Sequence, residues 1–274
     1  MAYSHSAIFI RLADAHPVVV AAARLGVAAA IMMPLAALRC RAEWRRLGAR
    51  ELALVALSGV LLAGLFASWI TSLRYTSIAN SVVLFGLSPV WIALVSPLLG
   101  WRVGRLMVVS VVLSIVGSAI IGWGSASGGE RTGLFGDGLA TIGGLCMAAY
   151  LLLGERARRQ LSLLGYVSLC YGTAAAILLL AVVILDLPVL GLTPTTYIAM
   201  ASLGLICQVI GHSTFNWALV RYSPQLVAVY LLGDVIFASL LGLLYFRESI
   251  AFPTLVGGGL MVVGIYLGIR AGIR

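Results

Sequence analysis

The sequence predicts an all-α polytopic membrane protein, a ten-helix bundle made from two inverted five-helix repeats. Three observations support this fold class. Of the 274 residues, 62% are hydrophobic and only 10% are charged, whereas a soluble domain carries roughly 25% charged residues. Apolar runs of about 20 residues, the length that crosses a bilayer as a helix, recur along the whole chain. The two halves of the chain also resemble each other at one constant offset.

Charged residues, Pro and Gly divide the chain into apolar runs that are long enough to cross about 30 Å of hydrocarbon as helices. These runs cover residues 17–38, 51–72, 78–100, 105–123, 138–154, 164–185, 195–219, 224–245 and 251–269. They lack the alternation of barrel strands. A shorter run, residues 1–13, precedes them without a positively charged stretch before it, which argues against a signal peptide. We therefore expect a first helix that is truncated at its N-terminus.

Arginine determines the expected orientation, because cytoplasmic loops of membrane proteins carry an excess of basic residues. The turn RCRAEWRRLGARE (39–51) holds five arginines. When this turn is placed in the cytoplasm, alternate turns bring most other arginines to the same side, and both termini face the cytoplasm. The net charge of +9 is therefore a topology signal rather than a sign of nucleic-acid binding. The expected location is the bacterial inner membrane.

The internal repeat is clearest in two stretches, LRYTSIANSVVLFG (73–86) and VRYSPQLVAVYLLG (220–233). Arg74 and Arg221 are separated by 147 residues, and the same step links other pairs along the chain. Each half holds five spans, an odd number, so the halves are expected to insert in opposite orientations. Inverted repeats are an architecture of secondary transporters, with the substrate site near the bilayer midplane. The expected division is residues 1–124 for the first repeat, 125–137 for an extracytoplasmic linker and 138–274 for the second repeat.

The segment CQVIGHSTFNWALVRY (207–222) carries a polar stripe inside an apolar span. Gln208, His212 and Asn216 are spaced four residues apart, so in a helix they lie on one face. Polar side chains in hydrocarbon face the bundle interior or a water-filled cavity, and His is the side chain best placed to change charge near neutral pH. We interpret the stripe as one wall of a substrate cavity. Interhelical hydrogen bonding alone is the alternative.

Asp234 lies near the middle of the run 224–245, where a carboxylate costs about 2.5–3.5 kcal/mol on insertion scales. We interpret it as a substrate contact or as a site that changes protonation during transport; a buried acid that serves packing alone is the alternative. The repeat step places an apolar and aromatic wall opposite the polar stripe, formed by Leu61, Leu65 and Trp69. Further candidates for the same cavity are Tyr150, its repeat equivalent Tyr3, and His5.

Arg24 also lies within an apolar run, but it is interpreted as structural. We expect its long side chain to extend to the outer membrane surface and to pair there with Asp14.

Several function classes lack their motifs. The sequence contains no GxxxxGK[ST] phosphate loop, no HExxH or GxSxG motif and no paired Cys/His cluster. An ATP-driven pump in one chain is therefore excluded, and neither an enzyme nor a metal or cofactor site is expected. The four cysteines form no CxxC pair and are interpreted as buried small residues.

Four stretches resemble the EamA-like branch of the drug/metabolite transporter superfamily, and the resemblance covers essentially the whole chain. They are SAIFIRLADAHPVVVAAAR (6–24), LRYTSIANSVVLFGLSPVWIALVSPLLG (73–100), GHSTFNWALVRYSP (211–224) and LGLLYFRES (241–249). The resemblance implies a ten-helix secondary transporter with cytoplasmic termini, which commonly moves amino acids, other metabolites or drugs outward. It also implies a cavity lined by helices 1, 3, 4, 6, 8 and 9. This chain departs from the family at Asp234-Val235-Ile236, where a Glu-Pro-Val-like turn is common.

Together these observations predict an exporter of small organic metabolites, amino-acid-like, aromatic or amphipathic, that works by alternating access. The alternatives are an importer or facilitator of the same solutes, and a membrane sensor or scaffold that binds its ligand without moving it. The expected partners are the solute and the lipid bilayer, while proton coupling and the oligomeric state are left open. The residues expected to line the cavity are Asp234, His212, Gln208, Asn216, Trp69, Tyr150, Tyr3 and His5.

Overall fold

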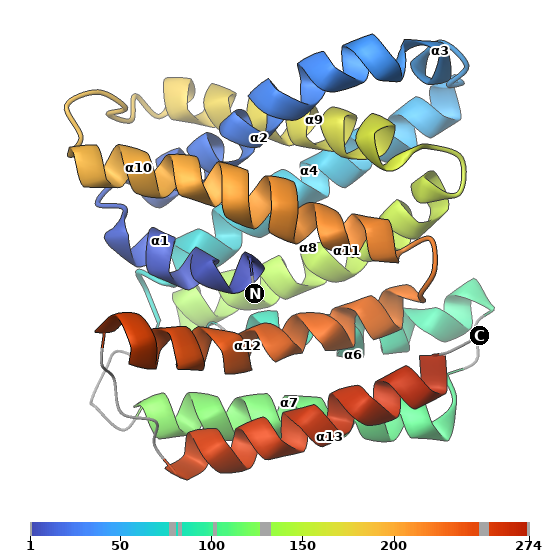
Figure 1. Cartoon of the computed structure of the whole chain (residues 1–274), viewed down its shortest axis with the longest axis vertical. Helices are drawn as coiled ribbons and strands as arrows, with labels where there is room; N and C mark the ends of the chain where they lie inside the picture. The colour runs from blue at the N-terminus through green and yellow to red at the C-terminus, as the bar shows by residue number, and fades with distance from the viewer. Residues whose placement is uncertain are drawn as a thin grey trace.

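The computed structural model describes residues 2–76, 81, 84–100, 103–126, 133–246 and 252–272. Within these residues all regular secondary structure is helical, and Figure 1 shows the helices lying side by side roughly along one direction. The predicted all-α fold class is confirmed. The first half contains η1 (Tyr3–His5), α1 (Ser6–Leu12), α2 (Pro17–Arg39), α3 (Arg41–Trp44), α4 (Ala49–Ser72), α6 (Ser88–Val95), η2 (Ser96–Leu99) and α7 (Arg105–Ala126).

The second half contains one long rod that changes helix type along its length. The elements of the second half are α8 (Leu134–Arg158), α9 (Leu163–Ile184), α10 (Pro194–Ser202), the π-helical η3 (Leu203–His212), α11 (Ser213–Ala218), α12 (Pro224–Phe246) and α13 (Phe252–Gly272). α10, η3 and α11 follow one another without a break and form the rod.

Within the described residues, five helices are long and apolar enough to cross a membrane: α2, α4, α8, α9 and the α10–η3–α11 rod. They contain 22 to 25 residues each, with a mean hydropathy of 1.5 to 2.4. At 1.5 Å per residue, this length covers about 30 Å of hydrocarbon. Shorter apolar helices lie at Ser88–Leu99, Arg105–Ile120 and Leu255–Ala271.

Local capping signals explain where several helices begin. Nδ1 of His16 accepts a hydrogen bond from the Val18 amide at 3.3 Å, and Ser162 Oγ accepts one from the Gly165 amide at 3.0 Å. Such side chains satisfy amides that have no partner inside the helix. Pro17 opens α2 at its first position, where the missing N–H costs nothing. α2 and α9 therefore begin within one residue of the predicted apolar runs.

Successive helices alternate in direction, so their connections gather at the two ends of the bundle. Figure 1 shows the α2–α4, α8–α9 and α11–α12 connections at one end, together with the C-terminus. The α1–α2 and α9–α10 connections lie at the other end. The first end therefore holds the five arginines of residues 39–50 and the arginines at the end of α8. We call it the arginine-rich end.

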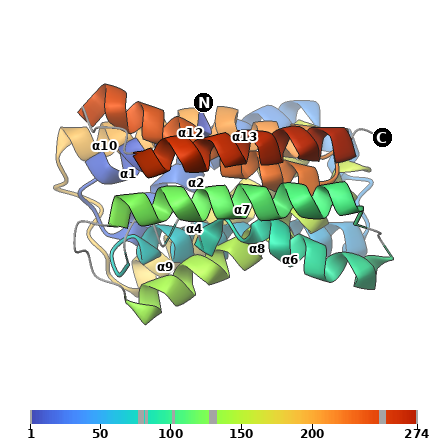
Figure 2. The same cartoon turned by 90° about the horizontal axis from the view of Figure 1, so that it is seen from below.

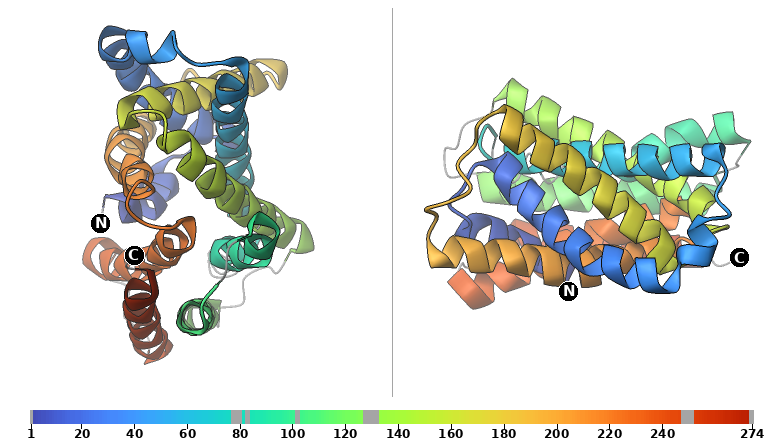
Figure 3. Two further views of the ribbon diagram at one scale, coloured as in Figure 1. Left: turned by 90° about the vertical axis from the view of Figure 1, so that its right-hand side faces the viewer. Right: turned by 90° about the horizontal axis from the view of Figure 1, so that it is seen from above.

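The hydrophobic core lies between α2, α4, α8, α9 and η3. α4 packs along α8 and α9, and α2 packs along α9 and η3; Figure 3, right, shows α2 and α9 side by side. Buried apolar side chains from these helices form one continuous cluster. The core thus surrounds the part of η3 that carries the predicted polar stripe.

α7 and α13 pack against each other at the edge of the bundle, as Figure 2 shows. Ser110 Oγ donates to the Gly264 carbonyl at 2.7 Å. A Cβ atom at Gly264 would overlap the Ser114 hydroxyl, and one at Gly268 would lie 2.7 Å from Ser110 Oγ. Small residues let membrane helices approach closely, so these positions determine the spacing between α7 and α13.

We predict that Gly264→Leu destabilises the protein by about 1–3 kcal/mol, the usual cost of overpacking a tight contact. The measurement is thermal unfolding of the purified protein in detergent. Gly258→Leu on the same helix is the matched control, because nothing lies within 4 Å of a Cβ at that position. Equal melting temperatures for the two variants would contradict the close α7–α13 contact.

Candidate functional site

Arg24 lies at the centre of the bundle rather than at its surface. Its side chain is 0% exposed, Nε donates to Oε1 of Gln208 at 2.7 Å, and a terminal nitrogen donates to Ser6 Oγ at 3.3 Å. The prediction that Arg24 extends to the outer surface and pairs with Asp14 is therefore wrong. The reason is the orientation of α2, because Arg24 leaves it on the face that packs against η3.

Close packing between α2 and η3 brings Arg24 next to Gln208. A Cβ atom at Gly204 in η3 would lie 2.5 Å from Val27 Cβ and 3.0 Å from the Arg24 carbonyl oxygen. Both approaches are shorter than an ordinary van der Waals contact, so only glycine fits at this position. η3 is π-helical over 10 residues, and π-helical segments are rare but frequent at functional sites.

The predicted polar stripe faces the interior, and all three of its side chains, Gln208, His212 and Asn216, are 0% exposed. The Tyr150 hydroxyl donates to Oδ1 of Asn216 at 2.9 Å, and Nδ2 of Asn216 donates to the His212 carbonyl at 3.2 Å. Tyr3 approaches from η1, with its ring centroid 6.1 Å from that of His212. The structure therefore brings five of the predicted site residues together.

Aromatic rings surround His212. The ring centroids of Tyr150, Phe66 and Tyr171 lie 5.3, 5.7 and 6.3 Å from that of His212. Phe66 also stacks on Arg24, with 4.0 Å between the guanidinium carbon and the ring centroid, which is a cation–π distance. We use the term central cluster for Arg24, Phe66, Tyr150, Tyr171, Gln208, His212 and Asn216.

Several polar atoms of the central cluster have no hydrogen-bond partner among the described residues. They are a terminal nitrogen of Arg24, Nε2 of Gln208 and both ring nitrogens of His212, all of them buried. Buried polar atoms in proteins are nearly always paired, and unpaired ones are costly in an apolar environment. These atoms therefore have unused hydrogen-bonding capacity inside the bundle.

Asp234 and His5 lie beside the central cluster, where η1 packs against α12. Asp234 is half-buried and lies within electrostatic range of Arg24 and His5. The His5 ring contacts those of Phe9 and Tyr245, at centroid distances of 6.1 and 6.2 Å. These two predicted site residues thus border the cluster from the side of α12.

Trp69 is buried. Its ring contacts Phe85 at a centroid distance of 5.1 Å. Leu65, predicted in the same wall, is fully buried, and the α4 ring that contacts His212 is Phe66. Adjacent residues on a helix point in different directions, and the spacing alone does not say which of them meets a given neighbour.

Two pairs in the central region are related by the repeat step of 147 residues. Arg24 of α2 stacks on Phe66 of α4, and their equivalents are Tyr171 of α9 and Ser213 of α11. The Tyr171 hydroxyl and Ser213 Oγ form a hydrogen bond of 2.9 Å. No site role was predicted from the sequence for Arg24, Phe66 or Tyr171. The signal that points to Arg24 is a charge inside an apolar run.

Arg158 closes the space between α8 and α11 near the arginine-rich end. It is 9% exposed, its Nε donates to the Asn216 carbonyl at 3.2 Å, and a terminal nitrogen donates to the Leu161 carbonyl. Together with the Tyr150–Asn216 hydrogen bond, this contact joins the two helices. No site role was predicted for Arg158 from the sequence.

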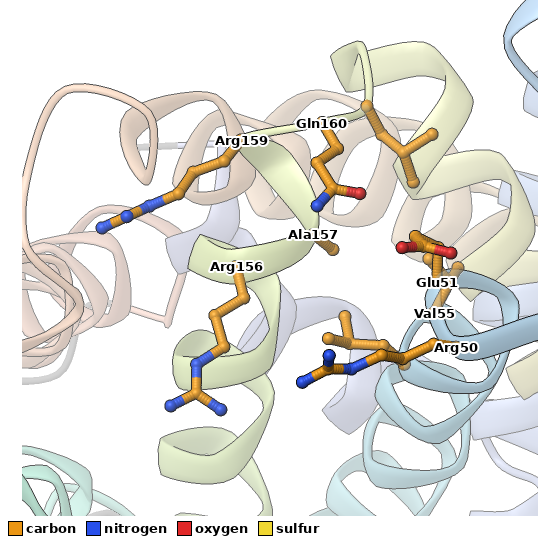
Figure 4. Close-up of a pocket in the computed structure, with 9 residues that line it drawn as sticks. Arg50, Glu51, Val55, Arg156, Ala157, Arg159 and Gln160 are labelled. Carbon is orange, nitrogen blue, oxygen red and sulfur yellow. The ribbon is translucent and has the colours of Figure 1, made fainter. Parts of the chain in front are cut away.

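A cavity of about 310 Å³ lies at the arginine-rich end between the start of α4 and the end of α8. Figure 4 shows the Arg50 side chain extending toward the guanidinium group of Arg156, while Arg159 points away. Arg159 instead pairs with Glu155 at 2.6 Å. None of the predicted site residues lines this cavity. In the described part of the chain, no group of three or more His, Cys, Asp or Glu is placed to hold a metal ion.

Comparison with known proteins places this architecture in one family. The model of the EamA-like transporter family matches residues 1–123 and again residues 134–270. The chain belongs to the EamA-like transporter family. It is therefore a multi-pass membrane protein of a transporter family, as the resemblance of its sequence predicted.

Relatives and a solved structure agree with the EamA-like assignment. The chain is 28% identical over 221 residues to an uncharacterised transporter of Archaeoglobus fulgidus, covering 79% of this chain and 75% of the relative. It is 23% identical over 250 residues to an uncharacterised transporter of Clostridium kluyveri, covering 87% and 78%. A crystal structure at 18% identity superposes with a TM-score of 0.81 over 98% of this chain and 93% of the other, which shows the shared fold.

We predict that Tyr150→Phe lowers the free energy of unfolding by about 1 kcal/mol, because it leaves Oδ1 of Asn216 without its donor. The measurement is thermal or denaturant unfolding in detergent. Tyr197→Phe is the control, since it removes a hydroxyl that donates to the Val189 carbonyl at an exposed position. A larger loss for Tyr197→Phe would argue against a buried Tyr150–Asn216 hydrogen bond.

Proposed function

We propose that this chain is a secondary transporter that exports small organic metabolites by alternating access. The observation that carries the proposal is the set of fully buried polar residues in the middle of an apolar bundle, Gln208, His212 and Asn216. Polar residues at this depth are expensive and mark substrate or ion pathways. The unpaired nitrogens of Gln208 and His212 supply hydrogen-bonding capacity to a solute.

The proposed solutes are amino-acid-like, aromatic or amphipathic. Rings from Tyr150, Phe66 and Tyr171 face His212, so a planar apolar body has surfaces to stack on. Asp234 supplies a carboxylate beside the cluster. The residues proposed to contact the solute are Asp234, His212, Gln208, Asn216, Trp69, Tyr150, Tyr3 and His5.

Alternating access requires two halves that move relative to each other around the site. We propose residues 1–124 and 138–274 as these inverted halves, joined by an extracytoplasmic linker at 125–137, of which residues 127–132 lie outside the described part. The two separate matches to the family model support this division. The contacts of Tyr150 and Arg158 with Asn216 fit a state closed toward the arginine-rich end. That end is assigned to the cytoplasm of a bacterial inner membrane, and both termini are proposed to be cytoplasmic.

The test is untargeted metabolite profiling of the medium from cells that express the chain. We expect one solute or a small group of related solutes to accumulate outside, and His212→Ala to reduce the accumulation at least tenfold at equal membrane levels. Thr214→Ala is the matched control on the same segment, because its hydroxyl donates to the Ile210 carbonyl of its own helix. Depletion of a solute from the medium would instead identify an importer. No change in either direction would favour a sensor or scaffold.

Asp234→Asn tests whether this carboxylate takes part in proton coupling. We predict that the variant retains binding but transports more slowly and loses its dependence on pH, because Asn cannot exchange a proton. The measurement is flux into proteoliposomes over a range of internal and external pH. Asp186→Asn at the exposed α9–α10 connection is the control, since its positive φ of 47° suits Asn as well as Asp. An unchanged rate and pH profile for Asp234→Asn would exclude a proton-carrying role for this residue.

A further inference from the structure

Arg24 is a permanent positive charge with no acidic hydrogen-bond partner in the described structure. Arginine side chains carry a positive charge in proteins, and this one is 0% exposed. Its hydrogen-bond acceptors, Gln208 and Ser6, are both neutral. A buried charge is normally paired with an opposite charge, because leaving it unpaired in a medium of low dielectric constant is costly.

The hydrogen bond to Gln208 determines what that residue presents to a ligand. Arginine has donors only, so the group of Gln208 that faces it is the carbonyl oxygen Oε1. The amide nitrogen Nε2 is then directed elsewhere, and it has no partner among the described residues, like one terminal nitrogen of Arg24. The site therefore offers N–H donors on two neighbouring buried groups, Arg24 and Gln208, and one positive charge.

The surroundings of these donors limit the ligand further. Phe66 packs on the guanidinium face at 4.0 Å, which fixes the plane in which the remaining N–H groups point. An arginine fork matches the two oxygens of a carboxylate. Phosphate has the same fork geometry, but a dianion would bring two charges to a site with one arginine. The adjacent rings of Tyr150 and His212 suit an apolar or aromatic body.

We propose that Arg24 and Gln208 bind the carboxylate of the solute, so that the transported class is monocarboxylates with an apolar or aromatic body. The assignment of a transported class rests on the proposed function. The binding site itself is testable without transport.

Binding is measured as thermal stabilisation of the purified full chain in detergent at constant ionic strength. The probes are acetate, phenylacetate and indole-3-acetate, with phenylacetamide as the uncharged analogue and inorganic phosphate as the competing oxyanion. We expect phenylacetate and indole-3-acetate to raise the melting temperature and phenylacetamide to have no effect. Arg24→Gln should weaken carboxylate binding about tenfold or more, as expected for loss of a charged hydrogen bond, and Gln208→Leu should weaken it less.

Arg221→Gln is the matched control, because Arg221 also stacks on an aromatic ring, Trp217, at 4.4 Å, but at an exposed position. It should retain full carboxylate binding. The proposal is overturned if no carboxylate stabilises the native chain, if phenylacetamide or phosphate stabilises it equally, or if Arg24→Gln binds normally.

A second variant separates ligand binding from charge balance with Asp234. If Arg24 served only to balance Asp234, the Arg24→Gln/Asp234→Asn double variant would regain carboxylate binding that Arg24→Gln had lost, and our proposal would be wrong. We expect no such recovery. Arg24-dependent binding without any exported solute would leave this site intact and refute the export proposal. An exported solute whose binding is independent of Arg24 would support export and refute the carboxylate site at Arg24 and Gln208.

Discussion

The hydrogen bond between Arg24 and Gln208 joins α2 to the π-helical segment η3 at the centre of the bundle, and the rest of the site depends on it. In the interior of a bilayer, polar groups find partners within the protein because water is not available. The bond holds the guanidinium against Phe66 and directs the amide nitrogen of Gln208 away from it. The positions of the Arg24 charge, of the polar stripe of η3 and α11 and of the aromatic rings around His212 are thus linked.

At the site, the backbones of η3 and α2 pack closely, and the side chains between them are polar. Gly204 brings η3 against α2, and the same approach buries Arg24 completely. The α7–α13 pair uses small residues in a similar way, but its contact lies at the edge of the bundle and carries no charge. Close approach alone therefore does not distinguish the site, and neither do buried polar atoms without partners, which Ser114 and Ser118 of α7 also carry. The fully buried charge of Arg24 does.

The polar stripe was predictable because its evidence is local. Three polar residues at a spacing of four in an apolar run must share a face of the helix. Because polar groups are costly in the hydrocarbon of the bilayer, that face turns toward the protein interior. Arg24 was misplaced because a long side chain at that depth has two possible directions, outward to the surface or inward to η3. The choice depends on how α2 is rotated against its neighbours, which spacing does not record. Phe66 was missed for the same reason, since it stands one position from the predicted Leu65.

The sequence by itself determined the helices, their approximate ends and the membrane setting, because hydrophobic run length, proline and capping residues act within a few neighbours. It also determined that Gln208, His212 and Asn216 face inward. Only the tertiary structure decided that Arg24 joins them, that Tyr150 pairs with Asn216, and that Trp69 packs on Phe85 instead. These contacts link residues far apart in the chain. They depend on the rotation and close approach of whole helices, which no short stretch of sequence specifies.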